Sequence, residues 1–261
     1  MKKNAILMVS FGTSYLDALE KTVDVLEHEV AETYPQYQVY RAFTSQMILN
    51  KLKRTQGLHF HNVREAMEQM MADQVERVIV QPTHIINGIE NEKMLSELAE
   101  YKNHFASIQV GEPLLSSIED YKKAVHALMG EVELAQDEVL LLMGHGTDHH
   151  ATAAYPALEY VFHNLGYHNV FVGTVEGFPE LEDVRKQLGN AALKKLVLFP
   201  FLLVAGDHAR NDMAGKEDSW KTKLEANGYE VRPILRGLGE LSEIRKIYME
   251  HIEEVMRGET E

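Results

Sequence analysis

Apolar and polar residues follow two alternating patterns along this chain. Short apolar runs that end at Gly, Pro or Ser are separated by longer stretches in which apolar residues recur every three or four positions. The first run, NAILMVSFGT, covers residues 4–13 and predicts a buried strand. The stretch after it predicts an amphipathic helix, because its apolar positions share one face: Leu16, Leu19, Val23, Leu26 and Val30.

The same alternation continues to the end of the chain. The further runs that predict strands are YQVYRAFTS, RVIVQPTHIING, SIQVGEPLLSS, EVLLLMGHGT, NVFVGTVEG, LVLFPFLLVAGDH and EVRPILRGLG. Strands that are apolar throughout, each followed by a helix, are typical of parallel sheets covered by helices on both faces. The predicted fold class is therefore α/β.

The eight runs form two similar sets of four. VSFGT at residues 9–13 matches MGHGT at 143–147, and the Pro and Gly of VQPTHIING match those of LFPFLLVAG. A repeat of this length predicts two similar doubly wound lobes, each with a four-stranded, mainly parallel sheet flanked by helices, and a ligand cleft between them. We place the N-terminal lobe at 1–130 and the C-terminal lobe at 131–261. The last helix, 241–256, has one apolar face that predicts docking, and the N-terminal lobe is one place where it could dock.

Composition narrows the range of functions. The net charge of -14 disfavours binding to nucleic acid or to an anionic membrane, and no run of 18 apolar residues predicts a membrane span. Because the chain has no cysteine, a metal would have to be held by His, Asp, Glu, carbonyl groups or water. The start of the chain reads as a core strand and not as a secretion signal, so we expect a cytoplasmic protein.

Comparison of the two halves points to a metal site. His145 stands where the first half has Phe11, Glu176 stands where it has Ser45, and His208 follows the third equivalent strand. Two imidazoles and a carboxylate that leave coordination positions open suit a divalent first-row metal. The C-terminal half is thus predicted to hold the metal, and His145 and His208 would bind it with Glu176.

Other interpretations of these residues remain open at this stage. Each histidine alone could be a buried or capping residue, and Glu176 alone could be a solvated loop acid. His149 lies four residues after His145, which is the spacing of a helical zinc site. However, Gly-His-Gly-Thr is a poor helix interior, so we interpret Thr147 or Asp148 as a helix cap and His149 as a first-turn residue.

The motifs resemble a known family. VSFGTSY, RAFTSQMI, HIINGIENEK, GEPLLSS, MGHGTDHHATAAY, FLLVAGDHARNDMAG, DSWK and GLGE occur in an order and spacing similar to those of the anaerobic, single-chain sirohydrochlorin cobaltochelatases of cobalamin synthesis, which are class II tetrapyrrole chelatases. The resemblance implies a tetrapyrrole in the cleft and Co2+ bound by His145, Glu176 and His208. Protoporphyrin ferrochelatases carry Asp-His-x-Glu at the last of these strand ends, and Arg210 in this chain argues against that branch.

The implied function is insertion of Co2+ into sirohydrochlorin with release of two protons. An imidazole has an ordinary pKa of about 6.5 and can accept a proton near neutral pH, so His145 is assigned as proton acceptor as well as ligand. The implied substrate-binding residues are Phe11, Gly12, Thr13, Ser45, His84, Glu90, Gly144 and Gly146. Gly144 and Gly146 would let a backbone and a flat ligand approach closely.

Further expectations concern the rest of the substrate. Apolar support for the ring could come from Phe11, Met143, Phe178 or Leu202, and a basic rim for its carboxylates from Arg41, Lys93, Arg210 or Lys216. Fe2+, Ni2+ or Zn2+ could replace Co2+ in vitro, no organic cofactor is expected, and a homo-oligomer is left open. The alternatives are a sirohydrochlorin ferrochelatase for sirohaem and a non-catalytic metal- or tetrapyrrole-binding protein.

Overall fold

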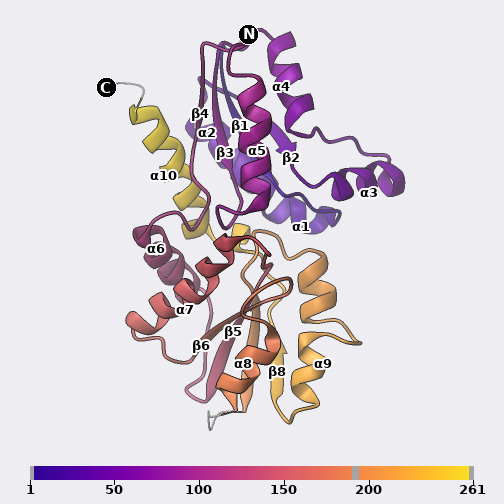
Figure 1. The fold of residues 1–261 in the computed structure, drawn as a ribbon, viewed down its shortest axis with the longest axis vertical. Coiled ribbons are helices and arrows are strands. Elements are labelled where there is room, and N and C mark those ends of the chain that lie inside the picture. The colour runs from indigo at the N-terminus through magenta and orange to yellow at the C-terminus, as the bar shows by residue number, and fades with distance from the viewer. Residues whose placement is uncertain (1–2, 190–193, 259–261) are drawn as a thin grey trace. The chain divides into compact units, whose positions relative to one another are not determined.

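The computed structural model describes residues 3–189 and 194–258 and divides into two compact units. The first unit contains the described residues up to Ser116 and those from Arg245 onward, and the second contains Ser117–Ile244. Each unit is built on one four-stranded sheet whose strands are all parallel. Figure 1 shows helices flanking each of the sheets.

The first unit follows the predicted order of strands and helices. Its strands are β1 (Asn4–Ser10), β2 (Gln38–Phe43), β3 (Arg77–Pro82) and β4 (Ser107–Val110), arranged β2-β1-β3-β4. Its helices are α1 (Leu16–Lys21), α2 (Val23–Thr33), α3 (Gln46–Gln56), α4 (Val63–Ala72), α5 (Ile89–Glu100) and most of α10 (Ser242–Gly258). The core forms where α4 and α5 cover apolar strand residues such as Leu7, Val9 and Val80.

The second unit repeats this plan. Its strands are β5 (Glu138–Gly144), β6 (Val170–Thr174), β7 (Lys195–Pro200) and β8 (Glu230–Pro233), arranged β6-β5-β7-β8. Its helical segments are α6 (Ile118–Met129), η1 (His150–Ala153), α7 (Ala154–Asn164), α8 (Leu181–Leu188), η2 (His208–Met213), α9 (Trp220–Glu225) and η3 (Leu238–Glu240). η1 and η3 are 3-10 helices and η2 is a π-helix. The predicted α/β class, with two doubly wound four-stranded parallel sheets, is confirmed.

The central strands are buried because helices cover both of their faces. In β5, Val139, Leu140, Leu141, Leu142 and Met143 are at most 1% exposed, so successive side chains are buried on opposite faces of the sheet. Trp220 from α9 also packs in this core. Met143 is therefore a core residue, and the suggestion that it supports a ring-shaped ligand is wrong.

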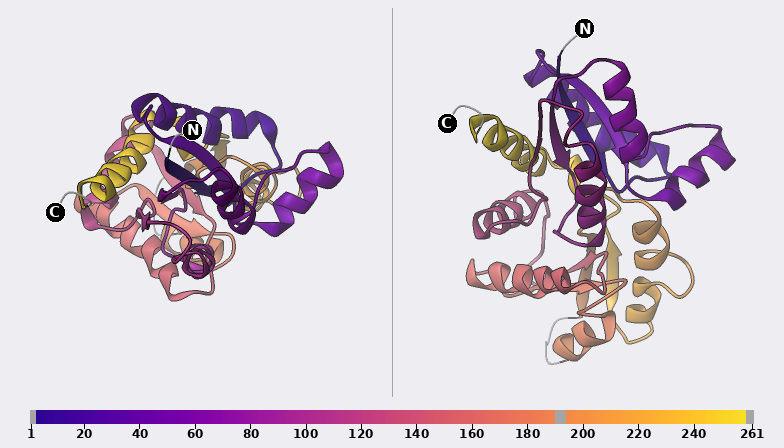
Figure 2. Two further views of the ribbon diagram at one scale, coloured as in Figure 1. Left: turned by 90° about the horizontal axis from the view of Figure 1, so that it is seen from above. Right: turned by 45° about the horizontal axis from the view of Figure 1, so that its top comes forward.

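The C-terminal helix α10, drawn in yellow in Figure 2, packs on the first unit. Arg245 forms a salt bridge of 2.7 Å with Glu29 of α2, and the buried Tyr248 hydroxyl donates to the carbonyl oxygen of Thr83 at 3.0 Å. α6 belongs to the second unit and packs against α7. The second unit thus begins before α6, at Ser117, whereas the sequence analysis placed the boundary after residue 130.

No described helix combines the length and apolar character that crossing a membrane requires.

Candidate metal centre

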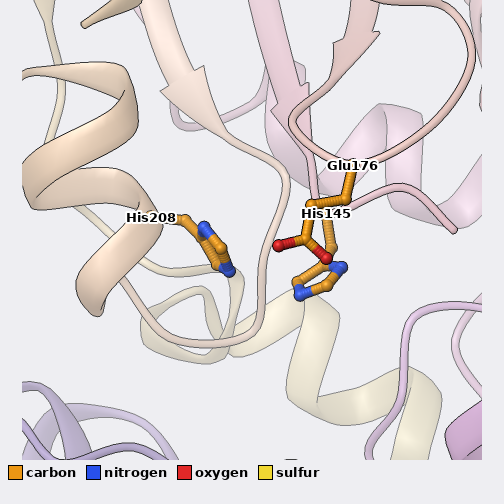
Figure 3. Close-up of side chains that lie close together, drawn as sticks. All are labelled: His145, Glu176 and His208. Atoms are coloured by element: carbon orange, nitrogen blue, oxygen red, sulfur yellow. The ribbon is translucent and has the colours of Figure 1, made fainter. Parts of the chain in front are cut away.

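Three neighbouring strands of the second unit bring His145, Glu176 and His208 together. His145 directly follows β5, Glu176 lies just beyond β6, and His208 begins η2 after β7. Since these strands are parallel neighbours, their carboxyl ends share one edge of the sheet. The potential ligand atoms of the three side chains lie within 4.8 Å of one another, and Figure 3 shows the carboxylate of Glu176 beside the two imidazoles.

The backbones of His145 and Glu176 are held together directly. The pairing of β5 and β6 ends at Gly144 and Thr174, and two further bonds follow it: Val175 N–H donates to Gly144 O at 3.1 Å and Glu176 N–H donates to His145 O at 2.7 Å. Gly146 has a φ of +84°, and a Cβ there would lie 2.7 Å from the carbonyl atoms of Glu176. A glycine is therefore needed for the turn after His145 to lie against Glu176.

The other glycine beside His145 makes room for a buried tyrosine. A Cβ on Gly144 would lie 2.2 Å from the Tyr155 ring, and Tyr155 is 2% exposed. The Tyr155 hydroxyl accepts a hydrogen bond from Gly146 N–H at 3.3 Å, and burial raises the pKa of the phenol to about 12. The expected close approach of a backbone is thus found at Gly146, where the Glu176 backbone lies against the glycine, and at Gly144 the neighbour is the Tyr155 ring.

Hydrogen bonds at Nδ1 determine which nitrogen each imidazole can offer to a metal. His145 Nδ1 lies 2.9 Å from Gly146 O, and His208 Nδ1 lies 2.7 Å from Asp212 Oδ2. A carbonyl oxygen and a carboxylate both accept, so we assign the proton to Nδ1 in each ring. Nε2 is then the nitrogen without a proton in each ring, and it is the atom that would bind a cation.

The donor set suits a first-row divalent ion. Metal–ligand bonds of about 2.1 Å allow ligand atoms to be up to about 4.2 Å apart, so small side-chain rotations would close the three groups around one ion. Two imidazoles and a carboxylate are ligands for Co2+, Fe2+ or Zn2+, and three protein ligands leave further coordination positions open. His145 and His208 are partly buried and Glu176 is exposed, which leaves the site accessible from one side.

His149 has a different role from the one predicted. It is the N-cap of η1, where its Nδ1 accepts from Ala151 N–H at 3.2 Å. Thr147 Oγ1 accepts from His149 N–H at 3.1 Å, one step before the helix. The assignment of the cap to Thr147 or Asp148 is therefore wrong. His145 and His149 also do not share a helix, so they do not form a helical metal-binding pair.

Several of the residues implied in substrate binding gather in the first unit. Phe11, Ser45 and Glu90 line a pocket of about 440 Å3 together with Lys93, whose ammonium group lies 2.7 Å from the Glu90 carboxylate. Ser45 also caps α3, because its hydroxyl accepts from Ile48 N–H at 3.4 Å. The pocket therefore presents an aromatic ring, a hydroxyl and an ion pair.

Gly12 and Thr13 follow β1, and His84 follows β3. The contacts of Gly12 and Thr13 are with neighbouring residues of the first unit. Gly12 has a φ of +97° and packs against the Phe43 ring, and the buried Thr13 hydroxyl accepts from Tyr15 N–H at 3.1 Å. His84 Nδ1 is buried without a hydrogen-bond partner among the described residues, and burial lowers the pKa of this imidazole to about 4. His84 is therefore neutral at physiological pH.

The residues suggested as a basic rim differ in their surroundings. The Arg41 guanidinium binds both Asp24 and Glu27, so its charge is already neutralised and the suggestion that it holds a substrate carboxylate is wrong. Arg210 Nε donates to Ala205 O at 3.2 Å, and Lys216 is exposed. Both follow His208 closely in the chain.

Sequence reasoning missed two residues that support the site. Asp212 lies four positions after His208, a spacing typical of side chains that meet on one helical face. Tyr155 ends the same motif that contains His145, but its position under Gly144 has no signal in the hydrophobic pattern.

Comparison with known proteins identifies the family. The model of the family described as cobalt chelatase (CbiK) matches residues 4–257. The chain belongs to the cobalt chelatase (CbiK) family. The resemblance seen in the sequence motifs is therefore confirmed.

Two curated relatives of this cobalt chelatase family member span nearly the same length. The chain is 39% identical over 256 residues to the sirohydrochlorin cobaltochelatase of Salmonella typhimurium, covering 97% of each chain. It is 32% identical over 257 residues to the sirohydrochlorin cobaltochelatase CbiKC of Nitratidesulfovibrio vulgaris, covering 97% of this chain and 90% of the relative.

Solved structures show the same fold at lower sequence similarity. SirB from Bacillus subtilis with Fe3+ aligns with a TM-score of 0.69 at 14% identity, over 99% of this chain and 98% of SirB. The sirohydrochlorin chelatase SirB from Bacillus subtilis subspecies spizizenii in complex with cobalt aligns with a TM-score of 0.66 at 15% identity, over the same shares of the two chains. At this identity the likeness shows a common fold.

Proposed function

We propose that this protein is a sirohydrochlorin cobaltochelatase that inserts Co2+ into sirohydrochlorin and releases two protons. The observation that carries the proposal is the cluster of His145, Glu176 and His208 at three adjacent strand ends of a cobalt chelatase family member. Two relatives at 39% and 32% identity bear the name of this activity.

The cluster has the properties that metal insertion requires. The ion is cargo, so it must be bound firmly enough to be captured and loosely enough to pass to the four ring nitrogens. Three ligands from the protein leave positions that water or the ring nitrogens can occupy. An exposed carboxylate and two partly buried imidazoles give an approaching ring access to the ion.

We assign the proton-accepting role to His145. Insertion exchanges two N–H protons of the ring for one divalent cation, so a base must stand beside the ion. As the ion passes from His145 Nε2 to the ring, this nitrogen would accept one N–H proton, pass it to water and then accept the second, so that both protons reach the solvent. The Nδ1–H bond to Gly146 O keeps Nε2 directed toward the site during the exchange.

The tetrapyrrole is proposed to contact the carboxyl ends of the strands. Phe178 follows Glu176 in the loop after β6 and is 56% exposed, which is unusual for a phenyl group and makes it a surface for a flat ring. The other proposed substrate contacts are Phe11, Gly12, Thr13, Ser45, His84 and Glu90 of the first unit and Gly144 and Gly146 of the second. The metal is proposed to be Co2+, with no organic cofactor.

The test is a metallation assay under anaerobic conditions. Purified protein, Co2+ and excess sirohydrochlorin are mixed, and initial rates are followed from the change in the absorption of the ring. We expect many turnovers per protein molecule, with Co2+ used faster than Fe2+, Ni2+ or Zn2+ at equal concentration. A spectral change that stops at one equivalent of protein would identify a binding protein, and faster turnover with Fe2+ would identify a ferrochelatase. Either result contradicts the proposal.

A further inference from the structure

We infer that Asp212 is a positioning residue that makes His208 the anchoring ligand of the metal cluster. The inference rests on the proposed function and assigns unequal roles to the two histidines. Asp212 Oδ2 accepts the His208 Nδ1 proton at 2.7 Å. The His208 and Asp212 side chains are 26% and 44% exposed, so the pair is at the surface of the site and not inside the core.

The two imidazoles have acceptors of different charge. His208 Nδ1 donates to a carboxylate, whereas His145 Nδ1 donates to the neutral carbonyl of Gly146. An anionic acceptor at Nδ1 increases the electron density at Nε2 and fixes the tautomer and the ring orientation, and so strengthens the bond to a metal. His208 should therefore bind the ion more firmly, and His145 is the ligand that releases the ion and takes up a proton.

The helix that carries this pair is held to the second unit. η2 contains His208 and Asp212 on one side, while Ala209 and Met213 are completely buried in the core of the unit. The backbone N–H of Arg210 donates to Gly206 O at 3.1 Å. The buried side of η2 thus fixes the position of Asp212, and its carboxylate can hold the His208 imidazole in one orientation.

A purely structural role for Asp212 makes a different prediction. An exposed pair at i, i+4 contributes little to helix stability. The same unit offers a matched control in Glu225, which pairs with Lys221 at i, i+4 in α9 and is also 44% exposed. If Asp212 only stabilised its helix, Asp212→Ala and Glu225→Ala would have the same small effects.

The experiment measures Co2+ binding without the tetrapyrrole. Co2+ affinity is determined by equilibrium dialysis for the full-length protein and for Asp212→Ala, Asp212→Asn and Glu225→Ala. We expect Asp212→Ala to raise the Kd for Co2+ about 10- to 100-fold, as the loss of a ligand's orienting partner does elsewhere. Asp212→Asn retains an acceptor oxygen without the charge, so its Kd should fall between those of Asp212→Ala and the unsubstituted protein. Glu225→Ala should leave the Kd unchanged.

Kinetics give a second measurement of the same assignment. Asp212→Ala should raise the KM for Co2+ and leave kcat at saturating Co2+ within about threefold, because the positioned base at His145 is intact. The inference is overturned if folded Asp212→Ala binds Co2+ as tightly as Glu225→Ala does, or if Asp212→Asn binds Co2+ as tightly as the unsubstituted protein. Because the dialysis contains no tetrapyrrole, failure of the metallation assay would reject the proposed function without altering this result.

Discussion

The imidazole rings of His145 and His208 meet edge to face, with centroids 4.7 Å apart and planes at 86°. Each ring also has its Nδ1 engaged by an acceptor, so neither can turn to offer its other nitrogen without losing a hydrogen bond. The rings come from different segments of the second unit, because His145 directly follows β5 and His208 begins η2. An ion bound to both Nε2 atoms would therefore link these two segments.

The three ligands should respond differently to substitution. His145→Ala should lower the rate of sirohydrochlorin metallation by at least about 100-fold even at saturating Co2+, because excess metal does not replace a positioned base. Glu176→Ala and His208→Ala should mainly weaken metal capture, so high Co2+ should restore part of their activity. The measurement is the initial rate against Co2+ concentration, with circular dichroism as a check of folding. Near-normal rates in folded His145→Ala would contradict the assignment.

Gly146 offers a test of the link between the backbone and the metal site. In Gly146→Ala the new Cβ would lie 2.7 Å from the carbonyl atoms of Glu176, so the loop that carries this ligand must move. We expect a loss of stability of about 3 kcal/mol and weaker Co2+ binding. Gly228 has the same φ of +84° but no atom within 4 Å of its Cβ position. Gly228→Ala should therefore cost only about 1 kcal/mol and leave Co2+ affinity unchanged.

Denaturant unfolding and Co2+ dialysis measure both effects in these two variants. Equal Co2+ affinity in Gly146→Ala and Gly228→Ala would show that the position of the Glu176 backbone does not matter for binding.

Tyr155→Phe tests the support under the turn at His145. Removal of the hydroxyl leaves the buried Gly146 N–H without this acceptor, which should cost about 1–3 kcal/mol of stability. It should also reduce the metallation rate, because the turn that directs His145 is less constrained. Tyr248→Phe is the control, since it removes a buried hydroxyl bonded to Thr83 O in the first unit. That variant should lose stability and retain Co2+ affinity, as determined by thermal unfolding and dialysis.

His84 should make stability depend on pH. Burial lowers its pKa from the ordinary 6.5 to about 4 in the folded protein. As the pH falls from 6.5 to 4, the unfolded chain takes up a proton at His84 and the folded protein does not, so the folded state loses stability. This contribution is fully present above pH 6.5, and the loss amounts to at most about 3 kcal/mol.

His84→Gln should therefore flatten the dependence of unfolding free energy on pH between 6.5 and 4. His126→Gln replaces an exposed histidine on α6 and serves as the control for the substitution itself. Equal slopes in the unsubstituted protein and in His84→Gln would contradict the lowered pKa.

The ligand cluster could be predicted because each strand end is visible in the sequence as the point where a short apolar run stops. The apolar runs before His145, Glu176 and His208 are buried strands, and the internal repeat aligned their ends. What the pattern could not predict depends on contacts between distant segments or on uncommon backbone geometry. The fit of Tyr155 against Gly144 is a tertiary contact, and the π-helix that carries His208 and Asp212 is an uncommon geometry that a 3.6-residue period does not predict.

The charged residues illustrate the same limit. Arg41 was one of several basic side chains that could have met an anionic substrate. Its neutralisation by Asp24 and Glu27 depends on how α2 packs beside β2, which brings two acids to one guanidinium. Phe178, another of the suggested apolar contacts, is 56% exposed and therefore not used in the core, which the hydrophobic pattern does not indicate either.

The hydrogen bond from Glu176 N–H to His145 O links two of the three ligand residues through their backbones, and His208 is not part of this link. The backbones of His145 and Glu176 are hydrogen-bonded to each other, whereas His208 lies on a separate helix, η2. Any relative displacement of η2 changes the distance from His208 to the other two ligands without altering the distance between those two. Substitutions within η2 can therefore change the affinity for the cargo ion while the geometry of the His145–Glu176 pair is preserved. Metal affinity and proton acceptance can thus be adjusted on separate segments of the chain.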